Sequence, residues 1–291
     1  MGLLIDIIMG GLINGSTLAL LAIGFSLIFG VARIVNFAHT AFYMVAAYCI
    51  YVVTQQMGLH AVWGMIAAVL VVTLLGMITY KFLINPIREH EGAVLIATIA
   101  LAMILQEVMS LIFTGTYLSV PALIDGFIPI LGVKVFYQQL LSFFSALVIL
   151  GGLYFFLMKT KVGLAIRSTA QDREVANLMG INEARVAMLT MGLSVGLAGF
   201  TGAVIVPLTV LEPGMWMSPL IMMMAVVVLG GLGSLKGSFI GAYILGFTEA
   251  LVVFLAPMGA FLKAPIALCI MILVLLMRPE GLFGVSFEEE R

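Results

Sequence analysis

Charged residues are scarce in this chain: only 9% of its 291 residues are Asp, Glu, Lys or Arg, whereas 63% are hydrophobic. A soluble domain carries about 25% charged and about 45–50% apolar residues, so this chain cannot cover a water-facing surface and must be solvated by lipid. The shortage excludes a soluble enzyme, a secreted disulfide scaffold and a nucleic-acid-binding protein. The apolar runs are also long and unbroken, without the alternation of polar and apolar residues that a transmembrane β-barrel requires.

Cysteine and histidine are equally rare. Both cysteines, Cys49 and Cys269, lie inside apolar runs, where a thiol behaves as a small hydrophobic side chain and a disulfide is not expected. The three histidines are scattered, so the sequence predicts neither a metal site nor a cofactor. The glycine- and serine-rich segment Gly233–Ser238 lacks the spacing of a P-loop, so the chain has no nucleotide site of its own.

Apolar runs fill most of the sequence and predict an all-α polytopic membrane protein, with residues 1–291 in a single transmembrane domain. A spanning helix needs about 20 apolar residues. The runs that approach this length are 3–31, 40–54, 61–81, 93–114, 137–158, 186–211, 219–233, 238–256 and 262–277. We therefore expect about nine transmembrane helices, with eight and ten as bounds. The runs 40–54 and 219–233 are short, so each is predicted to be broken or re-entrant.

Basic residues predict how these helices are oriented, because cytoplasmic loops are enriched in Lys and Arg. The basic residues occur at Arg33, at Lys81 and Arg88, in the loop 159–185, at Lys236 and at Arg278. If nine spans alternate, all of these places fall on one side, which we assign to the cytoplasm together with the C-terminus. The N-terminus and the loop 115–136 then lie outside.

Polar side chains inside or between the apolar runs are candidates for a transport path. They are Asn14, Ser16, Thr17, Asn36, His39, Glu107 and Glu249. A carboxylate at the bilayer centre costs about 2.5–3.5 kcal/mol, so the two acids should face the bundle interior or a wet cavity. Each acid is either a path residue or proton carrier, or a protonated or hydrogen-bonded acid that bridges two helices. Asn36 and His39 either satisfy the backbone of a broken helix, contact substrate, or form an ordinary cytoplasmic turn.

The loop 159–185 is the one substantial polar stretch, and it carries signals for a short helix. Thr169 and Asp172 fit the Ser/Thr-x-x-Asp/Glu pattern of a helix start. Gly180 is suited to the left-handed conformation that ends a helix. Asn182 can cap the span that follows.

A short amphipathic helix is therefore expected at about 170–179. Val175, Leu178 and Met179 form an apolar stripe at helical spacing. A surface helix of this size is marginal alone, so its apolar side needs a partner. That partner is either the lipid headgroup layer or a groove on a cytoplasmic protein.

Ordered motifs extend over nearly the whole chain. They are GSTLALLAIGFSLIFG at 15–30, NFAH at 36–39, GLAIRSTAQDREVANLMGIN at 163–182, GGLGSLKGSFIGAYILG at 230–246, Glu249-Ala250, and RPEGLFG at 278–284. In this order they resemble the LivH-type permeases of branched-chain amino acid ABC importers. Thr40 is a departure, because a glycine usually follows NFAH in that family.

This resemblance implies a transporter subunit of the bacterial inner membrane, not an enzyme. It would pair with a LivM-type permease or a second copy of itself, with two ATPase subunits that hold ATP and Mg²⁺, and with an extracytoplasmic binding protein. The substrate would be a branched-chain or other hydrophobic amino acid. The residues that match the family's ATPase-coupling segment are Gly163, Arg167, Asp172, Val175, Ala176, Leu178, Met179, Gly180 and Asn182.

Two alternative functions stay open at this point. The same machinery could import urea or short amides, which a permease sequence separates poorly from amino acids. A proton-coupled secondary transporter could instead use Glu107 and Glu249, but such a carrier needs no ATPase and would leave the loop helix without a purpose. Co-purification with two ATP-binding subunits would separate the ATP-driven functions from the proton-coupled one.

Overall fold

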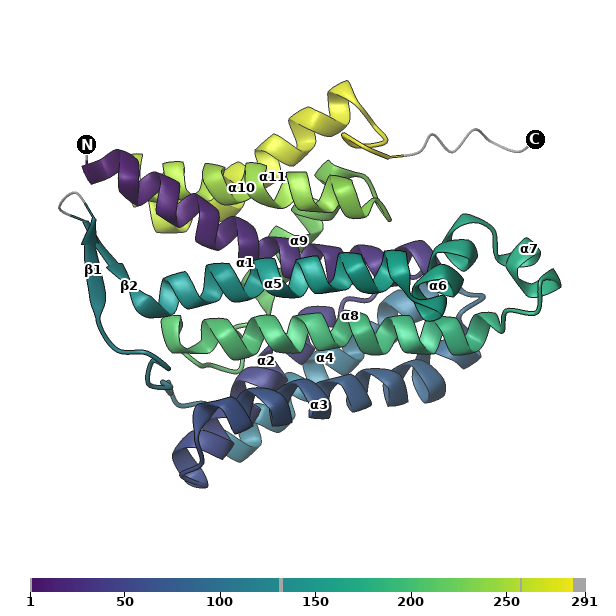
Figure 1. Ribbon diagram of the computed structural model, residues 1–291, viewed down its shortest axis with the longest axis horizontal. Coiled ribbons are helices and arrows are strands. Elements are labelled where there is room, and N and C mark those ends of the chain that lie inside the picture. Colours follow the sequence, from purple (N-terminus) through teal and green to yellow (C-terminus); the bar gives the residue numbers. More distant parts are fainter. Residues whose placement is uncertain (1, 131–132, 257, 285–291) are drawn as a thin grey trace.

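Long helices run along one axis of the molecule, as the computed structural model shows for residues 2–130, 133–256 and 258–284 (Figure 1). The α-helices are α1 (Gly2–Ala32), α2 (His39–Tyr51), α3 (Ala61–Thr79), α4 (Glu91–Phe113), α5 (Tyr137–Lys159), α6 (Lys161–Gln171), α7 (Arg173–Leu178), α8 (Glu183–Ile205), α9 (Met217–Gly230), α10 (Leu235–Leu255) and α11 (Gly259–Met277). Short π- or 3-10-helical turns extend three of them: η1 (Val52–Gln56), η2 (Tyr80–Ile84) with η3 (Asn85–Ile87), and η4 (Val206–Leu208). An antiparallel hairpin joins β1 (Phe127–Ile130) to β2 (Val133–Phe136).

Seven helices of the described residues, against nine expected spans, are long and apolar enough to cross a membrane. These are α1, α3 with its extension to Ile87, α4, α5, α8 with its extension to Leu208, α10 and α11. The other two expected spans are the short helices α2 and α9, of 13 and 14 residues. The chain is thus a multi-pass, mainly helical membrane protein, and the two runs that looked too short are indeed the two short helices.

Both short helices are buried inside the bundle. Nearly every side chain of α2 is buried, and α2 packs against α3 and α8. The C-terminal part of α9, from Met222 to Gly230, is largely buried against α1, α10 and α11. The break that precedes α2 is largely enclosed by protein, with Ile34, Asn36 and Ala38 buried, and protein is the surrounding in which non-helical backbone is tolerated at membrane depth.

Small residues allow the central helices to approach closely. α1 packs along α10, and a Cβ atom on Gly246 would collide with the backbone of Gly15. Lipid offers no hydrophobic force that drives helices together, so such backbone contact is a main source of packing energy in membranes. The glycines at these two positions therefore hold α10 against α1.

The two ends of the bundle differ in chemistry. One end, here called the basic end, holds Arg33 beside α7, Arg88 paired with Glu183, and the start of α10 near Gly30. The opposite end, here called the hairpin end, holds β1 and β2 beside the start of α1 (Figure 1). Most basic residues of the described chain therefore lie toward one end, whereas Lys134 of β2 and Lys263 at the cavity lie toward the hairpin end. Residues 285–291, the C-terminus whose cytoplasmic location was expected, lie outside the described residues.

Candidate functional site

A cavity of about 300 Å³ lies in the half of the bundle nearest the hairpin end. Seven helices contribute to its wall: α1, α2, α5, α8 with η4, α9, α10 and α11. Its polar side chains include Asn14, Thr17, Gln139, Ser218, Glu249 and Lys263. Three of the seven path residues expected from sequence, Asn14, Thr17 and Glu249, are thus brought to one cavity.

Glu249 and Lys263 form an ion pair in the wall of this cavity. Lys263 Nζ donates to Glu249 Oε1 over 3.0 Å, and the side chains are 12% (Glu249) and 37% (Lys263) exposed. Glu249 lies near the end of α10 and Lys263 near the start of α11. Gly259 allows this hairpin of helices, because a Cβ atom there would collide with the Val252 carbonyl oxygen. The acid therefore bridges two helices, as one of its two interpretations proposed, and it does so with a cation.

The polar residues of α1 divide between two surroundings. Thr17 Oγ1 donates to the Ile13 carbonyl of its own helix at 3.0 Å. Ser16 faces away from the cavity wall, donating to the Leu12 carbonyl at 2.8 Å and lying 2.9 Å from the Tyr243 hydroxyl of α10. Ser16 is therefore a helix-packing residue, which the sequence alone does not distinguish from its neighbours.

Asn36 and His39 are fully buried at the break between α1 and α2, away from the cavity wall. The Asn36 side-chain oxygen accepts from the Ala38 backbone N–H at 3.1 Å, and its carbonyl accepts from His39 N–H at 3.3 Å. His39 Nδ1 lies 3.3 Å from Ser194 Oγ of α8. The Asn36 side chain thus satisfies backbone at the break, whereas the His39 side chain contacts a hydroxyl of α8.

Glu107 contradicts the expectation that an intramembrane acid faces the interior. It is exposed on α4, among side chains that are mostly apolar. α4 packs against α2 through another face, which holds the buried Val94, Thr98 and Ala102, so Glu107 lies on the uncovered face of the single chain.

Two helices, instead of the single one expected at 170–179, occupy the polar loop at the basic end. α6 runs through Thr169, whose hydroxyl bonds to the Ala165 carbonyl inside that helix, so Thr169 does not start a helix. Asp172 does cap α7, accepting from the Val175 N–H at 3.0 Å. The sequence signal failed at Thr169 because Thr160 already caps α6 nine residues earlier.

Gly180 ends α7 in the way its sequence position suggests. Its φ angle is +84°, and its N–H bonds to the Asn177 carbonyl while the Ile181 N–H bonds to the Ala176 carbonyl, both at 3.0 Å. This is a Schellman motif, in which a left-handed residue satisfies the last carbonyls of a helix. Asn182 then caps α8 by accepting from the Arg185 N–H at 3.0 Å.

The expected coupling residues face two ways. Gly163 and Ala176 are buried, and Arg167 Nε donates to the Leu157 carbonyl at 3.0 Å, so these residues hold the loop against the bundle. The apolar stripe faces outward, with Val175 exposed and with Leu178 and Met179 exposed to 86% and 79%.

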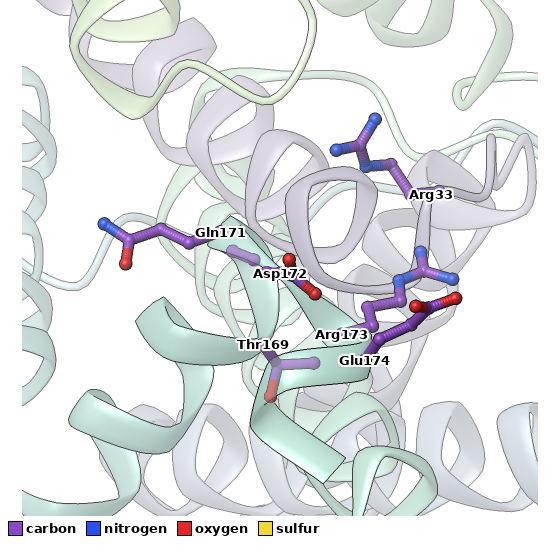
Figure 2. A pocket seen from close by; sticks show the side chains of 7 residues that line it. Arg33, Thr169, Gln171, Asp172, Arg173 and Glu174 are labelled. Carbon is purple, nitrogen blue, oxygen red and sulfur yellow. The ribbon is translucent and has the colours of Figure 1, made fainter. Parts of the chain in front are cut away.

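Glu183 ties this loop to the membrane helices. Its Oε1 atom lies 3.2 Å from Arg88 and 3.6 Å from Arg173. Burial lowers the pKa of the Arg173 guanidinium, while the charge of Glu183 acts in the opposite direction. A pocket of about 330 Å³ lies beside this cluster, where Arg33 approaches the start of α7 from the end of α1 (Figure 2).

Comparison with known proteins now assigns the fold to a family. Residues 7–277 match the family described as the permease component of the branched-chain amino acid transport system. The chain belongs to this permease family. The high-affinity branched-chain amino acid transport system permease protein BraD of Pseudomonas aeruginosa is 31% identical over 95% of this chain and 94% of its own length.

Other relatives have the same extent of similarity. The permease protein LivH of Escherichia coli is 28% identical over 94% of this chain and 93% of its own. A probable LivH of Methanocaldococcus jannaschii is 29% identical over 97% and 93%. No solved structure matches this chain. Permeases of this family are transport components and not enzymes.

Lys263 is the functional candidate that the sequence analysis missed. It lies within the run 262–277 and is not among the path residues predicted from the sequence. A signal was present, since Glu249 and Lys263 are opposite charges 14 residues apart on successive runs joined by a short turn. Two helices so connected are antiparallel neighbours, which places such charges side by side.

Proposed function

We propose that this chain is the membrane-spanning permease subunit of an ATP-driven importer for branched-chain or other hydrophobic amino acids. Family membership and the names of the relatives support the class of transporter. The observation that carries the ATP-driven mechanism is the exposure of Leu178 and Met179 on a polar loop at the basic end. Two large apolar side chains held outward by a rigid helix stop are suited to a groove on a cytoplasmic ATPase.

The positions of the helix ends are a better fit to a single permease domain that crosses the membrane nine times than to one that crosses it seven times. α1 and the extension of α3 both terminate at the basic end. Residues 34–60, which include α2, must therefore return the chain to the hairpin end between them. α8 and α10 both begin at the basic end. Residues 209–234, which include α9, must therefore bring the chain back from the hairpin end to the basic end. The Lys and Arg content of the basic end supports a cytoplasmic assignment, and hence a cytoplasmic C-terminus.

A second permease subunit, either LivM-type or another copy, would cover the outer face of α4. Lipid chains cannot hydrogen-bond the Glu107 carboxylate, and a charge left in hydrocarbon is costly. A polar group from a neighbouring subunit would remove that cost. An extracytoplasmic binding protein would then deliver substrate at the hairpin end, where the cavity lies.

The ion pair disfavours the proton-coupled alternative. A proton carrier must gain and lose its charge during transport, whereas Glu249 is already compensated by Lys263 at 3.0 Å. Glu107, the other acid, has no place in the cavity wall.

Reconstitution tests the proposed function directly. The chain, co-expressed with its partner permease and two ATPase subunits, is expected to purify as one complex. In liposomes that contain ATP, the complex should accumulate leucine only when the binding protein is outside. Uptake that requires a proton gradient and survives without ATP would refute the proposal.

A further inference from the structure

We propose that the Glu249–Lys263 pair binds the α-ammonium and α-carboxylate groups of a zwitterionic amino acid, and that the apolar wall of the same cavity holds its side chain. This inference rests on the proposed function, because it assigns the site and the chemistry by which the permease holds its substrate. Neither family membership nor the relatives' names assign such a site.

The pair presents two opposite charges at a spacing that an α-amino acid can match. Lys263 Nζ and Glu249 Oε1 lie 3.0 Å apart, and the two charges of an amino acid are separated by a similar, short distance. The substrate can therefore lie antiparallel to the pair, with its ammonium beside Glu249 and its carboxylate beside Lys263. Each charge then gains a second opposite neighbour, so neither protein charge is left uncompensated, an outcome that would be costly for the mostly buried Glu249 carboxylate.

Both partners have hydrogen-bonding capacity left for a ligand. Among the described residues, no group bonds to Glu249 Oε2, and Lys263 uses one of its three donors. Asn14 and Ser218 also line the cavity, and their side chains make no hydrogen bond with another described group. A wall that holds an ion pair and two polar side chains without an intramolecular hydrogen bond among the described residues is chemically suited to a charged or polar ligand.

The rest of the wall selects an aliphatic side chain. It includes Leu18 and Leu21 of α1, Leu208 of η4 and Met222 of α9. The volume of about 300 Å³ stands at the lower end of the 300–1,000 Å³ usual for ligand pockets, which fits one amino acid better than a peptide. Urea and short amides carry neither charge, so they cannot lie antiparallel to the pair.

Ligand analogues that lack one charge give the sharpest test. Binding of radiolabelled leucine to the assembled transporter in lipid nanodiscs, without the binding protein, is measured in competition with 3-methylbutylamine and 4-methylpentanoate. The amine lacks the carboxylate, and the acid lacks the ammonium. Glu249→Gln should weaken leucine and the amine by about tenfold to a hundredfold, the range of one hydrogen bond to a charged group, and should not weaken the acid, which becomes the counter-ion of Lys263. Lys263→Gln should weaken leucine and the acid and should not weaken the amine.

Two further variants separate binding from folding. The swap Glu249→Lys with Lys263→Glu keeps an ion pair between α10 and α11, so it should assemble normally and still lose leucine binding, because the charges are reversed relative to the apolar wall. Glu107→Gln removes an acid that does not line the cavity and should bind leucine as the wild type does.

Three results would overturn the site. They are absence of leucine binding to the wild type, wild-type binding by the swapped variant, and equal losses for all three ligands in the single variants. Uptake in liposomes is measured in parallel. If wild-type uptake requires ATP and the binding protein, the proposed function stands even where the site fails, whereas uptake without ATP refutes the function itself.

Discussion

Replacing Leu178 by aspartate should detach the permease from its ATPase subunits without harming the permease itself. Leu178 is 86% exposed at the end of α7. Its side chain contributes little to the fold of the single chain, so the Leu178→Asp variant should insert and fold normally. The whole effect of the substitution is therefore expected in the complex.

The magnitude follows from the area that docking would bury. Burying a leucine that is otherwise exposed is worth about 1.5–3 kcal/mol, and anchor residues of interfaces often lose at least about 2 kcal/mol when truncated. Aspartate also brings a charge into an apolar groove without a partner. Because about 1.4 kcal/mol corresponds to a factor of ten in affinity, docking should weaken by well over tenfold.

Co-purification and titration of ATPase subunits onto nanodisc-embedded permease measure this effect. Leu59→Asp is the matched control: the same substitution at an exposed leucine, placed before α3 at the opposite end of the bundle. The control should assemble as the wild type does. If Leu178→Asp retains full assembly and full transport, then α7 does not dock on an ATPase, and its apolar side chains rest on lipid headgroups instead.

Three other experiments test the loop, the helix packing and the orientation. At Gly180, a valine side chain would have space, but its backbone must adopt a φ of +84°, which costs about 1–2 kcal/mol. In Gly180→Val the end of α7 should therefore be distorted, so that ATP hydrolysis continues while the amount of leucine transported per ATP falls. Gly246→Leu would force its side chain into the Gly15 backbone of α1; overpacking costs about 1–3 kcal/mol, which should lower the detergent melting temperature, whereas Gly152→Leu, with open space around it, should not. Cysteines introduced at Arg173 and Asp125 should react with an impermeant thiol reagent from opposite sides of the membrane. Labelling of both cysteines from outside would refute the proposed topology.

Helix positions were predictable because lipid imposes a simple length rule. Every apolar run of the sequence became a helix, and the two short runs became the two short helices, α2 and α9. Which helices would be buried was not predictable, since α2 and α4 are similarly apolar and yet α2 lies inside and α4 outside. Burial depends on which neighbours a helix meets, and a single sequence does not contain that information.

The candidate cavity was only partly predictable for a related reason. Asn14, Thr17 and Ser16 are neighbours on one helix, but a rotation of one or two residues decides whether a side chain meets the cavity or α10. Glu249 drew attention as an acid in an apolar run, whereas its partner Lys263 lies close enough to a helix end to resemble an ordinary interfacial lysine. Opposite charges on two consecutive helices predict an ion pair only when the two residues are considered together.

The loop that holds α7 and the cavity lie at opposite ends of α8 and its extension η4. α8 begins at Glu183, which contacts Arg173 and Asn177 of α7, and its extension ends at Leu208 in the cavity wall. The intervening residues contain no proline before Pro207, so the helix has an unbroken hydrogen-bonded backbone along most of its length. A displacement of α7 by an ATPase subunit would therefore move the start of a helix whose other end borders the cavity. Coupling between its two ends would require α8 to adopt two discrete positions. A ligand that favours one of these positions must, by reciprocity, change ATPase docking by the same factor.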